Sequence, residues 1–249
     1  MEHLYLVQAY DQLRKSEDFV CENKQRIDAF SSYLMEHMAV SELPRAVVWT
    51  DLPTATSLIS DIPVPAYTNE YRTVISADCE AWKRLLLQQL EPYTDADAED
   101  IASIQACYQG FSAQHVLQIL GHELVHHSEW FADEFEDERN SGIWFEEGMA
   151  EYVSRRFFLT DQAYAALTDA NRKLVAMYDR QYGLPDLESF GAGTYHDHTA
   201  GIFCAYWRSF LAVEALVVRF GSVHAVFDSY WQWLQAGCGK TLAEWFGVK

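Results

Sequence analysis

The chain has 249 residues, of which 49% are hydrophobic, and its formal net charge is −19 at pH 7. This length and apolar content are enough for one large domain or two closely packed lobes around a substantial core. The negative charge argues against nucleic acid or an anionic membrane surface as a partner, and it favours neutral or cationic substrates.

The N-terminal segment shows no export or membrane signal. Residues 1–8 have neither a basic start nor a long apolar core, and no apolar run approaches the length needed to span a bilayer. The cysteines are scattered, odd in number and without Cys-x-x-Cys spacing, so we expect reduced, buried thiols in a cytoplasmic protein. They are Cys21, Cys79, Cys107, Cys204 and Cys238.

The first third of the chain combines helical and β-type patterns. Helical periodicity over residues 1–38, with a break near residues 16–18, predicts a helical hairpin that forms an N-terminal extension over residues 1–40. Residues 46–50 and 72–76 are short β-type runs separated by prolines, and they predict a small mixed sheet.

Helical patterns dominate the rest of the chain. We therefore expect an α+β fold with a sheet lobe over about residues 44–110 and an active-site helix and mostly helical lobe over about residues 111–249. The predicted helices cover residues 81–90, 98–108, 112–127, 148–158, 160–182, 206–220 and 223–236.

The segment His122-Glu123-Leu124-Val125-His126 has the spacing of a metal site on a helix. Histidines four residues apart share one helix face, so both imidazoles can reach one ion. Glu123 points to the side, where it can hold a water molecule and accept its proton without binding the metal. His127 is rotated by about 100° from His126, so we do not expect it to be a ligand. The alternative is that these histidines lie on a solvated helix face and bind no metal.

A second carboxylate-rich segment follows at residues 143–152. A catalytic zinc site needs three protein ligands and an open fourth position for water, and a glutamate from a second helix would complete it. The alternative is that Glu146, Glu147 and Glu151 are ordinary surface acids.

The run Trp144-Phe145-Glu146-Glu147-Gly148-Met149-Ala150 resembles the Trp-x-x-Glu-Gly-x-Ala motif of the gluzincin metallopeptidases, the thermolysin and aminopeptidase-N type. The resemblance implies that Glu147 joins His122 and His126 as the third Zn²⁺ ligand. It implies that Glu151 accepts the spare N–H of His122 and fixes its tautomer. It also implies a zincin-like domain over residues 41–249, in which an edge strand binds extended substrate beside the catalytic cleft. No Gly-x-Met-Glu-Asn segment precedes His122, which weakens aminopeptidase specificity and leaves endopeptidase activity open.

A further segment supplies a candidate for stabilising the oxyanion. Tyr206-Trp207-Arg208-Ser209 resembles the Tyr-x-Lys-Gly-Ala segment of the same family, and Tyr206 is our first choice as the catalytic donor at the start of a helix. The alternative for Tyr206 is a packed aromatic residue. Tyr195, His196 and His198 remain open as donors, because thermolysin-type enzymes use a histidine for this task.

The expected function is that of a zinc-dependent peptidase in which Glu123 is the general base and the substrate is a peptide or protein. Two other functions remain open: a zincin-fold binding or regulatory protein with structural zinc and little turnover, and a zinc hydrolase of a non-peptide amide. The acidic run at residues 133–138 is interpreted first as an exposed loop or helix end and second as a patch that steers substrate.

Overall fold

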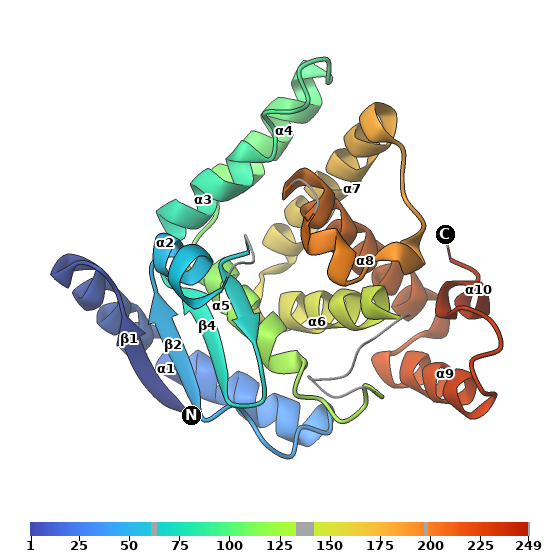
Figure 1. The fold of residues 1–249 in the computed structure, drawn as a ribbon, viewed down its shortest axis with the longest axis horizontal. Helices are drawn as coiled ribbons and strands as arrows, with labels where there is room; N and C mark the ends of the chain where they lie inside the picture. The colour runs from blue at the N-terminus through green and yellow to red at the C-terminus, as the bar shows by residue number, and fades with distance from the viewer. Residues whose placement is uncertain (61–63, 133–141, 197–198, 249) are drawn as a thin grey trace.

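The computed structural model describes residues 1–60, 64–132, 142–196 and 199–248 (Figure 1). As expected, the fold combines a small mixed sheet with a helical majority. The sheet order is β1-β2-β4-β3; β1, β2 and β4 are parallel, and β3 is antiparallel at one edge. The strands are β1 (Glu2–Leu6), β2 (Ala46–Thr50), β3 (Ala66–Thr68) and β4 (Arg72–Ser76).

Most helices lie where the sequence predicts them, and differ by a few residues at their ends. The α-helices are α1 (Tyr10–His37), α2 (Leu52–Thr54), α3 (Cys79–Gln88), α4 (Ala98–Gln109), α5 (Ala113–Val125), α6 (Ile143–Phe158), α7 (Asp161–Tyr182), α8 (Thr199–Phe220), α9 (Val223–Gln235) and α10 (Leu242–Phe246). The π-helix η1 covers Ala55–Ile59, and the 3-10 helices η2 and η3 cover Leu187–Ser189 and Ala192–His196.

The predicted N-terminal helical hairpin is wrong. Residues 2–6 form β1, which pairs with β2, and α1 is one continuous helix through residues 16–18. Leu4 and Leu6 are exposed, so apolar and polar residues of this edge strand do not alternate with burial as they do in a half-buried strand. The helical pattern that follows therefore dominates the prediction for this segment. Pairing with a strand 44 positions later decides its structure.

Helix α5 lies between the sheet and the helical part of the molecule. It contacts β3 and β4 on one side and α6 on another, and α1 also packs against it (Figure 1). Every residue of α5 from His115 to Val125 is buried except Ile119. A helix that is buried on every face has apolar residues around its whole circumference. Its polar side chains lie only where another polar group can pair with them.

Helix α8 corrects two expectations. It begins at Thr199, not near Tyr206, because residues 200–204 are also apolar and pack against the second core around α4 and α7. Its 22 residues are long and apolar enough to cross a membrane by length and composition, so the expectation that no run approaches that length is wrong. The helix packs on α6, α7 and α9, and half of its most apolar window is buried inside the structure.

Candidate metal centre

The ends of α5 determine where the two motif histidines lie. Ser112 caps the helix: its hydroxyl meets the backbone of the first turn, and its backbone N–H donates to Nδ1 of His115. The helix ends at Val125, and His126 is the C-cap residue with a helical φ of −60°. His122 and His126 therefore keep their shared face at the buried C-terminal end of the helix.

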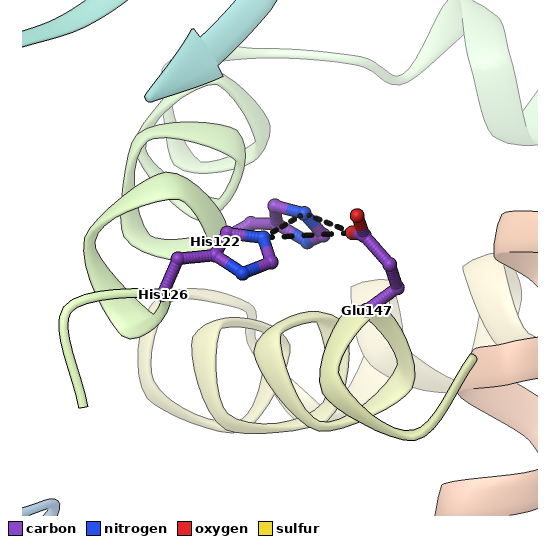
Figure 2. A group of neighbouring side chains, drawn as sticks. All are labelled: His122, His126 and Glu147. Atoms are coloured by element: carbon purple, nitrogen blue, oxygen red, sulfur yellow. Dashed lines mark hydrogen bonds and ion pairs between the residues drawn. The ribbon is translucent and has the colours of Figure 1, made fainter. Parts of the chain in front are cut away.

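Three ligand atoms from two helices meet at one point (Figure 2). The Nε2 atoms of His122 and His126 are 3.2 Å apart. Oε2 of Glu147, from α6, lies 3.0 Å from Nε2 of His122 and 3.5 Å from Nε2 of His126. Ligand atoms that lie 2.0–2.1 Å from a tetrahedral ion are about 3.3–3.4 Å from one another. The triangle of side-chain atoms therefore has the size of one face of a zinc tetrahedron.

The outer nitrogen of each ring faces a carboxylate. Nδ1 of His122 lies 3.2 Å from Oε1 of Glu151, and Nδ1 of His126 lies 2.8 Å from Oε1 of Glu146. A neutral imidazole that donates from Nδ1 turns the lone pair of Nε2 inward. Three lone-pair atoms would then face one another, an arrangement that a cation stabilises.

Glu151 is itself held from two sides. Nε of Arg155 donates to its Oε2 at 2.5 Å, and Nε2 of Gln118 donates to the same oxygen at 3.3 Å. Burial raises the carboxyl pKa, but the charge of Arg155 and the bond to His122 outweigh it and lower the pKa of Glu151 to about 2. The carboxylate that orients His122 is therefore ionised and fixed.

The buried acids of the centre have opposite protonation behaviour. Burial raises the pKa of Glu123 to about 7, and the nearby histidines only partly oppose it. Burial also disfavours ionised Glu147, but both histidines outweigh it and hold the pKa of that carboxyl well below its usual range. Burial disfavours protonated His122, yet bonds to Glu147 and Glu151 raise its pKa to about 9. Glu123 is thus the carboxyl that can exchange a proton near neutral pH.

Gly148 explains how α6 brings Glu147 to this point. A Cβ at Gly148 would lie 2.2 Å from the backbone oxygen of Ser209 in α8 and 2.7 Å from a methyl carbon of Val213. Only glycine permits α6 and α8 to approach so closely. The residue next to the candidate ligand therefore sets the distance between the helix with the carboxylates and the helix with Tyr206.

Two tyrosine hydroxyls reach the centre. Oη of Tyr206 lies 2.9 Å from Oη of Tyr195, which donates to Oε1 of Glu147 at 3.5 Å. The ring of Tyr206 is 5.9 Å from that of His122. Burial, followed by the charge of Glu147, raises the pKa of Tyr206 well above its ordinary value, so its hydroxyl stays a donor. Tyr206 lines the same cavity as Glu123, whereas Tyr195, in η3, does not line this cavity.

The other histidines near the motif and the remaining candidates lie elsewhere or outside the described residues. His115 packs on Phe111, and His127 lies 3.1 Å from Thr68 Oγ1 of β3. His198 and the acidic run at 133–138 lie outside the described residues, as does the side chain of His196. The cysteines are free as expected, but the expectation that all are buried is wrong, because Cys21 and Cys238 are exposed.

Sequence reasoning missed the roles of Glu146 and Arg155. The sequence offers Glu146 as a surface acid or as a substitute third ligand, whereas in the structure its carboxylate lies beside the outer nitrogen of His126. Arg155 lies four residues after Glu151, a spacing that predicts an ion pair on a helix and could have identified it.

No family model, curated protein or solved structure matches this chain.

Proposed function

We propose that the protein is a zinc-dependent peptidase of gluzincin type. The observation that supports this most is the triangle formed by the Nε2 atoms of His122 and His126 and Oε2 of Glu147, with sides of 3.2, 3.0 and 3.5 Å. Two imidazoles and one carboxylate with an open fourth position are the ligand set of hydrolytic zinc enzymes. When bound there, zinc would supply Lewis-acid polarisation of the carbonyl and would lower the pKa of water.

Glu123 has the position of the general base in this proposal. It follows the first histidine on α5, is buried, and lines the cavity that also exposes His122 and Tyr206. Its carboxylate accepts the proton of the attacking water and passes it to the leaving amine. A structural metal site has no use for a buried acid at this place that binds no metal itself.

Tyr206 is the proposed donor to the oxyanion. In the described part of the chain its hydroxyl bonds to the Tyr195 hydroxyl at 2.9 Å, a neutral bond that can be exchanged for one to a substrate oxygen. The Tyr195 hydroxyl donates to Glu147 and orients Tyr206 through the bond between the two hydroxyls. The open alternative among the described side chains is Tyr195 itself, which the same substitution series tests.

A zincin-like arrangement of the lobes is part of the proposal. Strand β3 is the edge of the sheet nearest to α5, and these two elements are in contact. Its outer edge is available to an extended peptide that adds as a further strand. Substrate bound in this way would run past the C-terminal end of α5, where the motif histidines lie.

The test combines metal analysis with hydrolysis of a mixed peptide library by wild type and by Glu123→Gln. Wild type should hold one zinc ion per chain and cleave peptides. Glu123→Gln should keep the zinc and the fold but lose at least about a hundredfold in kcat, because an amide cannot accept the proton. Zinc binding without cleavage by wild type would favour a regulatory protein. Cleavage of non-peptide amides alone would point to another hydrolase.

In the same assay, Tyr206→Phe removes one hydroxyl. An oxyanion donor should lose about a hundredfold in kcat with little change in KM. Tyr195→Phe is the matched control and should lose less, because it acts through Tyr206. The reverse order of effects would transfer the donor role to Tyr195.

A further inference from the structure

Arg155 is buried where three helices meet, although its side chain carries a full positive charge. It lies on α6, four residues after Glu151 and eight after Glu147, and is 4% exposed. Its partners among the described residues come from α6, α7 and α8. It is not one of the three candidate ligands, the general base or the oxyanion donor, so the proposed hydrolysis leaves its position unexplained.

Three contacts fix the direction of the Arg155 guanidinium. Its Nε donates to Oε2 of Glu151 at 2.5 Å, and its Nη1 donates to Oδ1 of Asn171, in α7, at 2.7 Å. The central carbon of the group lies over the ring of Phe210, in α8, at 3.8 Å from the ring centre. The guanidinium is planar, so two acceptors and one aromatic ring together prevent it from turning.

The bond to Glu151 connects Arg155 with the candidate metal centre. Oε2 of Glu151 also accepts from Nε2 of Gln118 at 3.3 Å, so two donors hold the same oxygen. The other oxygen, Oε1, is left for Nδ1 of His122 at 3.2 Å. Arg155 therefore determines which oxygen of Glu151 faces His122.

Asn171 supports Arg155 from a second helix. It is fully buried in α7, and in the described part of the chain its side chain bonds only to Arg155. A neutral amide oxygen satisfies a guanidinium N–H without neutralising the charge. A carboxylate at this position would compete with Glu151 for Arg155, whereas the amide leaves the whole charge to Glu151.

Stability gives little reason for an ion pair at this place. Two charges lose more in desolvation than they gain from attraction in many buried pairs, and apolar replacements of similar volume are often as stable or more stable. The pair of Arg155 and Glu151 has another use, because its carboxylate faces a candidate ligand. A histidine that is already oriented loses less freedom when it binds a metal, so it binds more tightly.

We propose that Arg155 is a positioning residue for the metal centre and that Asn171 acts through it. The contacts run from Asn171 in α7 through Arg155 and Glu151 in α6 to His122 in α5. Helix α7 supplies no candidate ligand, yet its asparagine determines how firmly one of the ligands is held. This inference rests on the proposed function for the identity of the metal, zinc.

The experiment measures the zinc affinity of the full chain by competition with a chromophoric chelator. Arg155→Met removes the charge but keeps most of the volume, and should lower the affinity about tenfold or more. Asn171→Leu removes the acceptor and should lower it at least about threefold, because Arg155 is then less firmly held. Arg155→Lys keeps the charge without the planar group, so its affinity should lie between those of Arg155→Met and wild type. Unchanged affinity in Arg155→Met overturns the proposal, and unchanged affinity in Asn171→Leu removes Asn171 from it.

A double-mutant cycle tests whether the effect passes through Glu151. In the Glu151→Gln background, Arg155→Met and Asn171→Leu should cause little further loss of zinc affinity, because the contact that they support is already weakened. The same fold loss in both backgrounds would mean that the two side chains act independently of Glu151, and would overturn the proposal.

Two matched variants control for a general disturbance of packing. Arg208→Met removes another buried arginine, which bonds to the backbone oxygen of Pro185. Thr168→Val changes a buried polar residue of α7 one turn before Asn171, and its hydroxyl has no partner in the described part of the chain. Both variants should keep the wild-type zinc affinity, whatever their melting temperatures. Affinity that falls in step with the melting temperature in all the variants, controls included, overturns the proposal.

The visible absorption spectrum of the Co²⁺-substituted protein gives a second measurement, because its bands depend on the geometry of the ligands. The bands should change in Arg155→Met and Asn171→Leu but not in the two controls. Identical spectra in all variants would contradict a positioning role.

Cleavage of peptides by wild type separates this proposal from the proposed function. Cleavage by wild type, with full zinc affinity in the Arg155 and Asn171 variants, refutes the positioning role and leaves the peptidase. Lower zinc affinity in these variants, with no cleavage by wild type, refutes the peptidase and leaves the positioning role. A wild type that binds no zinc refutes both.

Discussion

The two ends of helix α5 each bury a histidine, and the two rings behave in opposite ways. His115 and His122 are both 5% exposed and lie two helical turns apart. Burial lowers the pKa of His115 to about 4. At His122 burial acts in the same direction, but two carboxylates reverse it and raise the pKa to about 9.

The difference shows that burial of a histidine does not by itself make a metal site. His115 has a backbone N–H and the ring of Phe111 as neighbours, so it is a packed helix-capping residue. His122 meets Glu147 at one nitrogen and Glu151 at the other. Both carboxylates come from α6, which contacts the C-terminal half of α5. The acids, not the imidazole, distinguish the two ends.

Glu147→Ala should have the largest effect on this comparison. Among the described residues, it removes the only carboxylate that faces both Nε2 atoms, and a two-histidine site holds zinc far less well. Zinc affinity should fall by more than the roughly 10–100-fold that loss of an outer partner costs. Competition with a chromophoric chelator measures it. Full zinc stoichiometry in Glu147→Ala would move the third ligand to Glu146 or Glu151.

Glu151→Gln should make His122 more like His115. The amide is a weaker acceptor and leaves Arg155 without its charged partner. Zinc affinity should fall about 10–100-fold, by the same chelator titration. Glu146→Gln is the matched change at His126 and should cost a similar amount. If neither change weakens zinc binding, Glu146 and Glu151 do not affect the zinc affinity of the site. The opposite pKa shifts of His115 and His122 would then not reflect a difference in metal binding.

Gly148→Ala should disturb the approach of α6 to α8 without removing any polar group. The new methyl group meets the Ser209 backbone, which cannot rotate away, so α6 and α8 must separate. The free energy of unfolding should fall by about 1–3 kcal/mol, measured by urea denaturation. Gly239→Ala is the control, because nothing lies within 4 Å of its Cβ. Equal stability of both variants would show that the helices can adjust at no cost.

His115→Gln should have the smallest effect, and only in acid. Because folding lowers the His115 pKa from 6.5 to about 4, the unfolded chain binds more protons between these values, and stability is lost as the pH falls through that window. Glutamine keeps an acceptor for the Ser112 N–H but does not titrate. At pH 5.5 the variant should therefore lose about 1 kcal/mol less than wild type relative to pH 7.5. Parallel pH profiles in urea would contradict the depressed pKa.

Much of the helical part and the metal motif could be predicted from the sequence because they depend on local spacing. The four-residue separation of His122 and His126 fixes their shared face wherever the helix lies. The strands at residues 46–50 and 72–76 also appear where their β-branched runs predict them. Strand β1 could not be predicted, because its residues are exposed or half-buried and their strand conformation depends on pairing with β2.

The sequence by itself determined which residues of α5 could meet a metal and that acids follow on a helix 20 residues later. The motif resemblance already implied the places of Glu147 and Glu151. Only the tertiary structure shows that Glu146 faces Nδ1 of His126, because local spacing does not say which ring nitrogen a neighbouring acid reaches. The close contact of α6 with α5 and α8 directs Glu147 between the two Nε2 atoms and the other two acids to the outer nitrogens.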